Sequence, residues 1–167
     1  MLITEFEKKI GRPLKRNITV LGLDTASKSG FCVLKLTKKK LTYKLGTFKV
    51  DTKDTNFRYN GIIDFFQELI KPEYKVVIED TFFRFNPRMY CMISRIGAIA
   101  YTLAHLKGCE VDYLYCTSAR KSLGLKGNGK KADVQADFKR MIGIEIEDND
   151  ACDAMILAIS GALAKLI

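Results

Sequence analysis

Residues 18–36 have the sequence ITVLGLDTASKSGFCVLKL, and this stretch decides the fold. Its first seven residues are mostly apolar and end at Asp24, which is typical of a buried strand. After a turn of small residues, residues 30–36 indicate a second strand. Residues 41–50 nearly alternate in polarity and predict a third strand, with the lysine run 38–40 as the hairpin tip. We therefore expect three antiparallel strands joined by short connections.

The rest of the chain has the pattern of mixed α/β structure. Apolar residues recur there at helical spacing, interrupted by two short buried runs typical of strands. The predicted elements are helices at 57–70, 89–106, 132–142 and from 148 to the C-terminus, and strands at 75–79 and 111–115. Hairpin strands followed by β-α-β units predict an α/β fold. We expect one mixed five-stranded sheet, three strands antiparallel and then two parallel, with helices on both faces.

Length and charge limit the classes of protein. The 167 residues suit one domain, and the net charge of +9 favours a polyanionic partner, nucleic acid first and an anionic membrane second. The uncharged run Ala154–Ala164 is far shorter than the ~20 residues of a membrane span, and no secretory signal is apparent. Residues 1–16 are rich in lysine and arginine. We expect them to form a basic arm outside the core of a single domain at 17–167.

Cysteine and histidine usage narrows the chemistry. The cysteines are odd in number with no C-x-x-C pair, which indicates reduced thiols in the cytoplasm. The single histidine, His105, gives no support for a zinc site or a Ser-His-Asp triad. We therefore expect an enzyme of this sequence to depend on carboxylates, with no small-molecule cofactor.

Four acidic residues lie where predicted elements end or begin: Asp24, Glu79, Asp150 and Asp153. Asp24 closes the first strand and Glu79 closes the fourth. Asp150 and Asp153 are three residues apart, so both lie on one face of the last helix. Carboxylates that are buried close together need a cation between them, and their oxygens suit Mg²⁺ or Mn²⁺. If the first and fourth strands are neighbours, all four residues converge on one divalent-cation site.

Each acidic residue also has a simpler interpretation. Asp150 and Asp153 suit the first turn of a helix because of its macrodipole. Asp24 alone suits a turn at the end of a strand, and Glu79 alone suits a surface position. Glu79 and Asp80 are adjacent and point to opposite faces of a strand, so only one of them can join the cluster.

Two segments combine cations with features that favour contact with DNA. Residues 118–131 are rich in glycine and basic residues and contain no acid, so the backbone can approach phosphates closely. Residues 82–90 interleave aromatic residues with arginine, which suits base stacking. A solvated loop and a buried aromatic cluster are the simpler alternatives. The candidate DNA-binding residues are Phe82, Arg84, Arg88, Arg120, Lys121, Lys126, Lys130 and Lys131.

Four segments, in this order along the chain, together resemble the RuvC family of Holliday-junction resolvases within the RNase H-like superfamily. They are LGLDTASKSGFCVL (21–34), VVIEDTF (76–82), SARKSLGLKGNGKKADVQ (118–135) and DNDACDAMILAI (148–159). The resemblance implies an RNase H-like fold and metal ligation by the four acidic residues named above. It also implies that Phe82 stacks on bases and that Lys121 and Lys131 match basic residues of the family. Asp80 stands where the family usually has an amide, and residues 1–16 have no clear family counterpart.

The resemblance implies a metal-dependent endonuclease that resolves branched DNA by paired symmetric nicks, leaving 5′-phosphate and 3′-hydroxyl ends. Two Mg²⁺ ions per site are expected, with Mn²⁺ as a substitute. A homodimer would match the symmetry of a four-way junction, and the helix at 89–106 is our candidate interface. The small size and basic arm favour a phage origin.

Three other interpretations stay open. The first is another RNase H-fold nuclease, such as one that cuts RNA–DNA hybrids. The second is a lobe of a sugar-kinase or actin-like ATPase, although those folds need two lobes. The third is a junction-binding protein that has lost catalysis.

Overall fold

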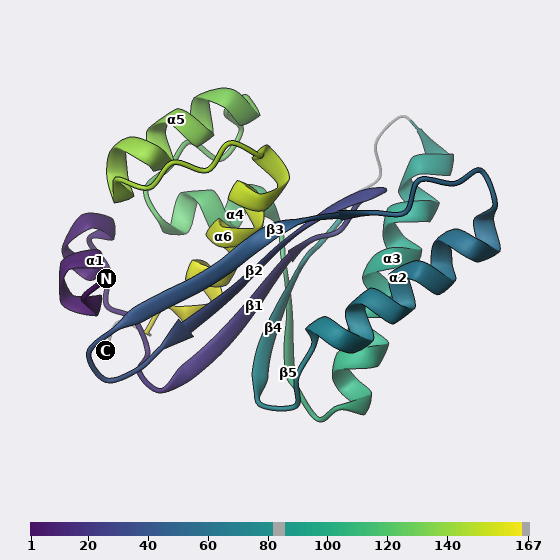
Figure 1. The fold of residues 1–167 in the computed structure, drawn as a ribbon. Coiled ribbons are helices and arrows are strands. Elements are labelled where there is room, and N and C mark those ends of the chain that lie inside the picture. Colours follow the sequence, from purple (N-terminus) through teal and green to yellow (C-terminus); the bar gives the residue numbers. More distant parts are fainter. Residues whose placement is uncertain (82–85, 165–167) are drawn as a thin grey trace.

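The computed structural model describes residues 1–81 and 86–164 (Figure 1). In chain order the elements are α1 (Ile3–Ile10), β1 (Ile18–Asp24), β2 (Lys28–Leu36), β3 (Leu41–Lys49), α2 (Thr55–Leu69), β4 (Tyr74–Glu79), α3 (Pro87–Leu106), β5 (Glu110–Leu114), α4 (Cys116–Ser122), α5 (Lys131–Ile142) and α6 (Asn149–Ala162). The five strands form one sheet in the order β3-β2-β1-β4-β5. The pairs β1–β2 and β2–β3 are antiparallel, whereas β1–β4 and β4–β5 are parallel. The predicted α/β fold with a mixed sheet is confirmed.

Helices cover both faces of the sheet, as predicted (Figure 1). Side chains alternate between the faces of each strand. Val20 and Val77 therefore pack in the cluster that contains α6, whereas Leu21 and Val76 pack in the cluster with α2 and α3. Within the described part of the chain, no helix has the length and hydropathy that crossing a membrane requires.

Helix α6 lies directly against the strands because two glycines face it. A Cβ atom on Gly22 would stand 2.1 Å from the carbonyl oxygen of Ala154, and one on Gly30 would stand 2.0 Å from that of Asp150. Any side chain at either position would therefore push the helix away from the sheet. This close approach brings the first turn of α6 to the end of β1, where Asp24 lies.

The expectation that residues 1–16 lie outside the core is wrong. They contain α1, whose Ile3, Phe6 and Ile10 are buried in the same cluster as α6. Lys9 Nζ also donates a hydrogen bond to the carbonyl oxygen of Ile142, at the end of α5. The apolar residues recur at three and four positions, so one face of the helix is buried while Lys8 and Lys9 stay in water.

Candidate active site

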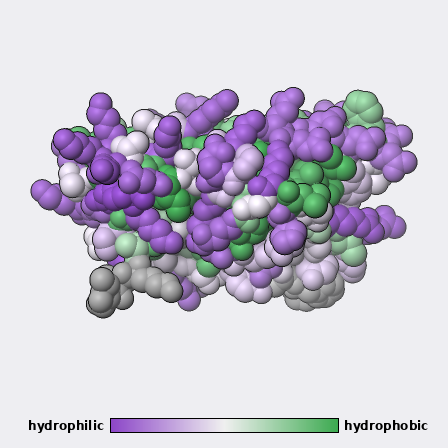
Figure 2. All heavy atoms as spheres, turned by 90° about the horizontal axis from the view of Figure 1, so that it is seen from below, coloured by the Kyte–Doolittle hydropathy of each residue, from purple (hydrophilic) through white to green (hydrophobic). Residues whose placement is uncertain are grey.

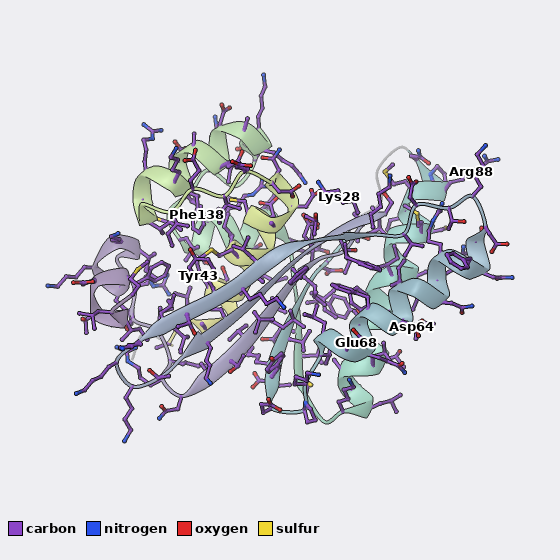
Figure 3. All side chains as sticks on the ribbon, viewed as in Figure 1. Lys28, Tyr43, Asp64, Glu68, Arg88 and Phe138 are labelled. Atoms are coloured by element: carbon purple, nitrogen blue, oxygen red, sulfur yellow. The ribbon has the colours of Figure 1, made fainter. Side chains whose placement is uncertain are left out.

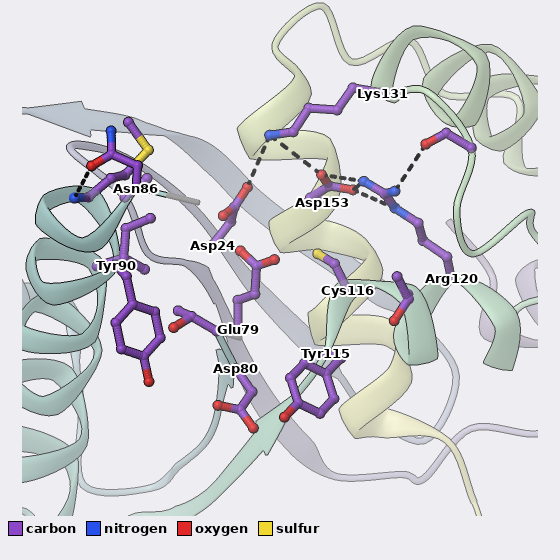
Figure 4. A pocket seen from close by; sticks show the side chains of 16 residues that line it. Asp24, Glu79, Asp80, Asn86, Tyr90, Tyr115, Cys116, Arg120, Lys131 and Asp153 are labelled. Atoms are coloured by element: carbon purple, nitrogen blue, oxygen red, sulfur yellow. Dashed lines mark hydrogen bonds and ion pairs between the residues drawn. The ribbon is translucent and has the colours of Figure 1, made fainter. Parts of the chain in front are cut away.

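Carboxylates from three elements meet at the end of the sheet. Leu23 of β1 lies opposite Ile78 of the parallel strand β4, so Asp24 and Glu79 follow at neighbouring positions. Asp153 reaches them from the first turns of α6. Together they line one pocket of about 390 Å³ (Figure 4). The predicted convergence therefore holds for Asp24, Glu79 and Asp153.

Burial and repulsion make Asp24 an unusual acid. The residue is only 5% exposed, and its carboxyl group lies beside that of Glu79 in the pocket (Figure 4). Burial first, and then the neighbouring Glu79, raise the pKa of Asp24 well above its ordinary value, although Lys131 opposes this shift. Asp24 and Glu79 therefore form a pair of acids that lacks a full counter-charge.

Asp153 is held by a buried arginine. Arg120 Nη2 lies 2.8 and 2.7 Å from the two carboxylate oxygens of Asp153, and Nε lies 3.1 Å from Oδ1. Nη1 donates to the carbonyl oxygens of Gly127 and Gly129 at 3.3 and 3.4 Å, which ties the glycine-rich segment to the carboxylate. The pKa of Asp153 is nevertheless raised, because burial outweighs the effect of Arg120.

The prediction that Arg120 contacts DNA is corrected by this geometry. The segment 118–131 begins inside helix α4, and Arg120 is one of the buried residues of that helix. Arg120 falls four residues after Cys116 and three before Leu123, both of which are buried. That spacing was the signal in the sequence that the residue faces inward.

Lys131 lies among the aspartates. Its Nζ is 2.8 Å from Asp150 Oδ1 and 3.8 Å from an oxygen of both Asp24 and Asp153. Burial alone would lower the pKa of Lys131, but its bond to Asp150 and the charges of Asp24 and Asp153 raise it. Lys131 is thus an internal counter-ion of the acidic cluster, a role that sequence reasoning did not assign to it.

Asp150 lies beside the pocket rather than in its wall, and cations link it to its surroundings. Besides Lys131, it pairs with Lys28 Nζ at 3.4 Å. Lys28 also pairs with Asp148, whose side chain caps α6 by accepting from the backbone N–H groups of Asp150 and Ala151. The helix-capping role in this turn therefore belongs to Asp148. Sequence reasoning missed Lys28, because only the packing of α6 against β2 brings this lysine to the start of the helix.

The remaining candidates divide into three groups. Asp80 lies on the far side of Glu79 from Asp24, as predicted from strand alternation, but it lines the same pocket (Figure 4). Exposed cations are available to a ligand around the site: Arg88, Lys121, Lys126 and Lys130. Phe82 and Arg84 lie outside the described residues.

Cys116 also lines the pocket. Burial, followed by the nearby carboxylates, raises the pKa of its thiol, so the thiol stays protonated.

The donor set fits a divalent cation. Carboxylate oxygens are the ligands that Mg²⁺ and Mn²⁺ prefer, and the raised pKa values of Asp24 and Asp153 indicate charge that still needs compensation. In the described residues, however, no three acidic, cysteine or histidine side chains are already gathered as a cation cage. Arg120 and Lys131 hold the aspartates instead.

Comparisons with known proteins give the family that the chain resembles. The family model described as Crossover junction endodeoxyribonuclease RuvC matches residues 20–161. The proteins of that name from Bdellovibrio bacteriovorus and Campylobacter lari are 30% and 25% identical to this chain. The first match covers 85% of this chain and 88% of its relative, and the second covers 84% and 93%.

Solved structures share the fold. The structure described as T. thermophilus RuvC in complex with Holliday junction substrate superposes with a TM-score of 0.72 at 17% identity. The match covers 86% of this chain and 92% of the Thermus chain. The family match begins at residue 20, so α1 lies outside it.

Proposed function

Because the chain belongs to the RuvC family of crossover junction endodeoxyribonucleases, we propose that it is a metal-dependent endonuclease that resolves four-way and other branched DNA. The observation that carries this proposal is the pocket in which Asp24, Glu79 and Asp153 meet, with Asp150 beside it. The exposed cations on α3 and in residues 121–130 are suited to the phosphates of the substrate.

We assign the metal ligands from the positions of the carboxylates. Asp24 interacts with both Glu79 and Asp153. It would bridge two ions, with Glu79 on one ion and Asp150 and Asp153 on the other. When bound, two Mg²⁺ ions, for which Mn²⁺ would substitute, lower the pKa of the attacking water and stabilise the leaving 3′ oxygen. The products would carry 5′-phosphate and 3′-hydroxyl ends.

The two cations that pair with the aspartates have different tasks. Arg120 makes five hydrogen bonds that fix Asp153 and the carbonyl groups of Gly127 and Gly129, so its task is to position a ligand. The side chain of Lys131 is half exposed and would leave the aspartates if ions took its place. It can then bind the phosphate that is being cut, because its Nζ already reaches the carboxylates that would hold the ions.

We further propose a homodimer that uses the outer side of α3. Ile96 and Ala100 on this helix are buried against its own sheet, whereas Leu106 on the outer side is 76% exposed. Two copies related by a two-fold axis would bring two pockets to the two strands that a junction must have cut. Light scattering of the Leu106→Glu protein should report a monomer if this side is the interface, and an unchanged dimer would exclude it.

A nick-mapping experiment tests the proposed function. Synthetic four-way junctions labelled on each strand are incubated with the protein, with and without Mg²⁺, and an RNA–DNA hybrid is tested beside them. We expect two symmetric nicks in the junction only with Mg²⁺, and none with the Asp24→Asn protein. Cutting of the hybrid alone would support the alternative nuclease, and binding of the junction without any cutting would support a protein that has lost catalysis.

A further inference from the structure

The excess positive charge is confined to one third of the chain. Residues 1–53 contain 13 Lys and Arg but only 4 Asp and Glu, which accounts for the whole net charge of +9. Residues 54–167, which contain all the DNA-binding candidates, carry 15 residues of each sign. The charge is densest in residues 25–50, where seven lysines occur without any acid. These residues form the β2–β3 hairpin.

The hairpin lysines are exposed, and most have no carboxylate partner. Lys28 pairs with acids of the active site and Lys49 pairs weakly with the exposed Asp51. The other five face solvent with no ion pair among the residues that the structure describes: Lys35, Lys38, Lys39, Lys40 and Lys44. Hydrophilic side chains cover the left end of the face in Figure 2, the side on which Figure 1 draws α1 and the β2–β3 loop.

These lysines follow the edge of the sheet away from the active site. β3 is an edge strand of the sheet, and its Lys49 lies opposite Lys28 of β2 at the active-site end. Figure 3 shows Lys28 at that end and Tyr43 of β3 further along, beside α1. From Lys49 to Lys40 the strand extends nine residues, or about 30 Å at ~3.3 Å per residue. That length is close to one turn of B-DNA, roughly 34 Å.

Helix α1 fixes the far end of this track. The backbone N–H of Ile3 donates to the carbonyl oxygen of Lys39 at 3.0 Å, and Leu2 forms a β-bridge with Lys40. The N-terminal amine donates to the carbonyl oxygen of Leu41 at 3.2 Å. A long hairpin tip is mobile when nothing supports it. Here a helix that lies outside the matched family region holds three consecutive lysines in place.

We propose that the lysine edge, defined as β3 with the tip 38–40, is a second DNA-contact surface that binds the phosphates of a duplex arm leaving the active site. This inference rests on the proposed function. Lysines on an edge strand also prevent strands of different molecules from pairing, which is the simplest rival explanation. Protection of the edge explains Lys44 but does not require three lysines at a tip that is already bound to α1.

The test compares two variants of equal net charge. One replaces Lys38, Lys39 and Lys40 with glutamine, and its control replaces Lys71, Lys139 and Arg140, exposed cations on other elements. Binding is measured by fluorescence anisotropy in EDTA at several salt concentrations, so that no cleavage occurs. Two junctions are compared, one with arms of about 15 base pairs and one with loop-closed arms of about 6 base pairs. At ~3.4 Å per base pair, only the shorter arms fail to reach the tip.

On the long-armed junction we expect the tip variant to bind at least tenfold more weakly than the control. We also expect its plot of log affinity against log salt to be shallower by about 2 to 3, because each lost phosphate contact removes about 0.9. On short arms the two variants should bind alike.

Three results would overturn the lysine edge as a DNA surface. The first is an equal salt slope for the tip variant and its control. The second is a tip variant that loses binding to phosphatidylserine vesicles but keeps its DNA binding, and the third is a tip variant that aggregates but binds DNA normally. Cleavage of the short-armed junction in Mg²⁺ separately tests the proposed nuclease, because that substrate does not reach the tip. A protein that fails to cut but passes the anisotropy test would therefore lose only the proposed function.

Discussion

Replacement of Gly30 by alanine tests how the fold positions the acidic site. The new Cβ would stand 2.0 Å from the carbonyl oxygen and 2.3 Å from the carbonyl carbon of Asp150. Ordinary van der Waals contact begins near 3.4 Å, so the backbone at the start of α6 must move by about 1.4 Å. The atoms in contact belong to backbone, so rotation of a side chain cannot relieve the clash.

This movement affects both aspartates of α6. A displacement of about 1 Å in a catalytic site can lower the rate 100-fold. We therefore expect the Gly30→Ala protein to cut a four-way junction in Mg²⁺ at about 1% of the wild-type rate or less, measured in single turnover with saturating enzyme. Affinity for the junction in EDTA should stay within a few-fold, because the exposed cations are untouched.

Gly97→Ala provides the matched control. A Cβ at this position in α3 would meet nothing closer than 3.7 Å, so the substitution fits without movement. Alanine is also a better helix former than glycine by up to ~1 kcal/mol. We expect this protein to keep its activity and to gain slightly in melting temperature. A Gly30→Ala protein as active as the Gly97→Ala protein would refute the view that contact between α6 and β2 positions Asp150 and Asp153.

Further predictions concern the charges of the site. Lys131→Met removes the internal counter-ion, so Mn²⁺ should bind more tightly in the absence of DNA, as titration calorimetry would detect. Unchanged affinity would contradict the view that Lys131 and the metal ion compete for the aspartates. Arg120→Ala breaks a buried ion pair and should cost about 3–5 kcal/mol of unfolding free energy, whereas Arg140→Ala on the surface should cost less than ~0.5 in the same urea titration. Because the raised pKa of Asp24 means that the folded state binds its proton more tightly than the unfolded state, metal-free stability should fall as pH rises from about 4 through that raised pKa. Asp24→Asn should flatten this dependence in unfolding experiments across pH, and an identical profile for both proteins would exclude Asp24 as its source.

The sequence was sufficient wherever one local pattern determined the position of a residue. Asp24 and Glu79 each end a buried apolar run, and parallel pairing of those runs brings the two acids together. The spacing of Asp150 and Asp153 likewise fixed them on one side of a helix. Strand alternation correctly predicted that Asp80 points away from Asp24, but not that Asp80 also lines the pocket.

The roles of the cations could not be read from local patterns. Arg120 and Lys131 have similar sequence surroundings to Lys126 and Lys130, yet only the first two reach the carboxylates. That choice depends on where α4 and α5 pack against α6, which is a tertiary property. The burial of α1 was predictable in principle, because Ile3, Phe6 and Ile10 form an apolar stripe, but the neighbouring lysines concealed it.

Anomalous diffraction from crystals soaked in Mn²⁺ would test the central claim most directly, because it locates the ions without relying on activity. We predict Mn²⁺ peaks between Asp24 and Glu79 and between Asp24 and the aspartates of α6, with Lys131 withdrawn from the cluster. Mn²⁺ found only elsewhere on the molecule, with Lys131 still bound to Asp150 at saturating metal, would contradict the assignment of this pocket as the catalytic site.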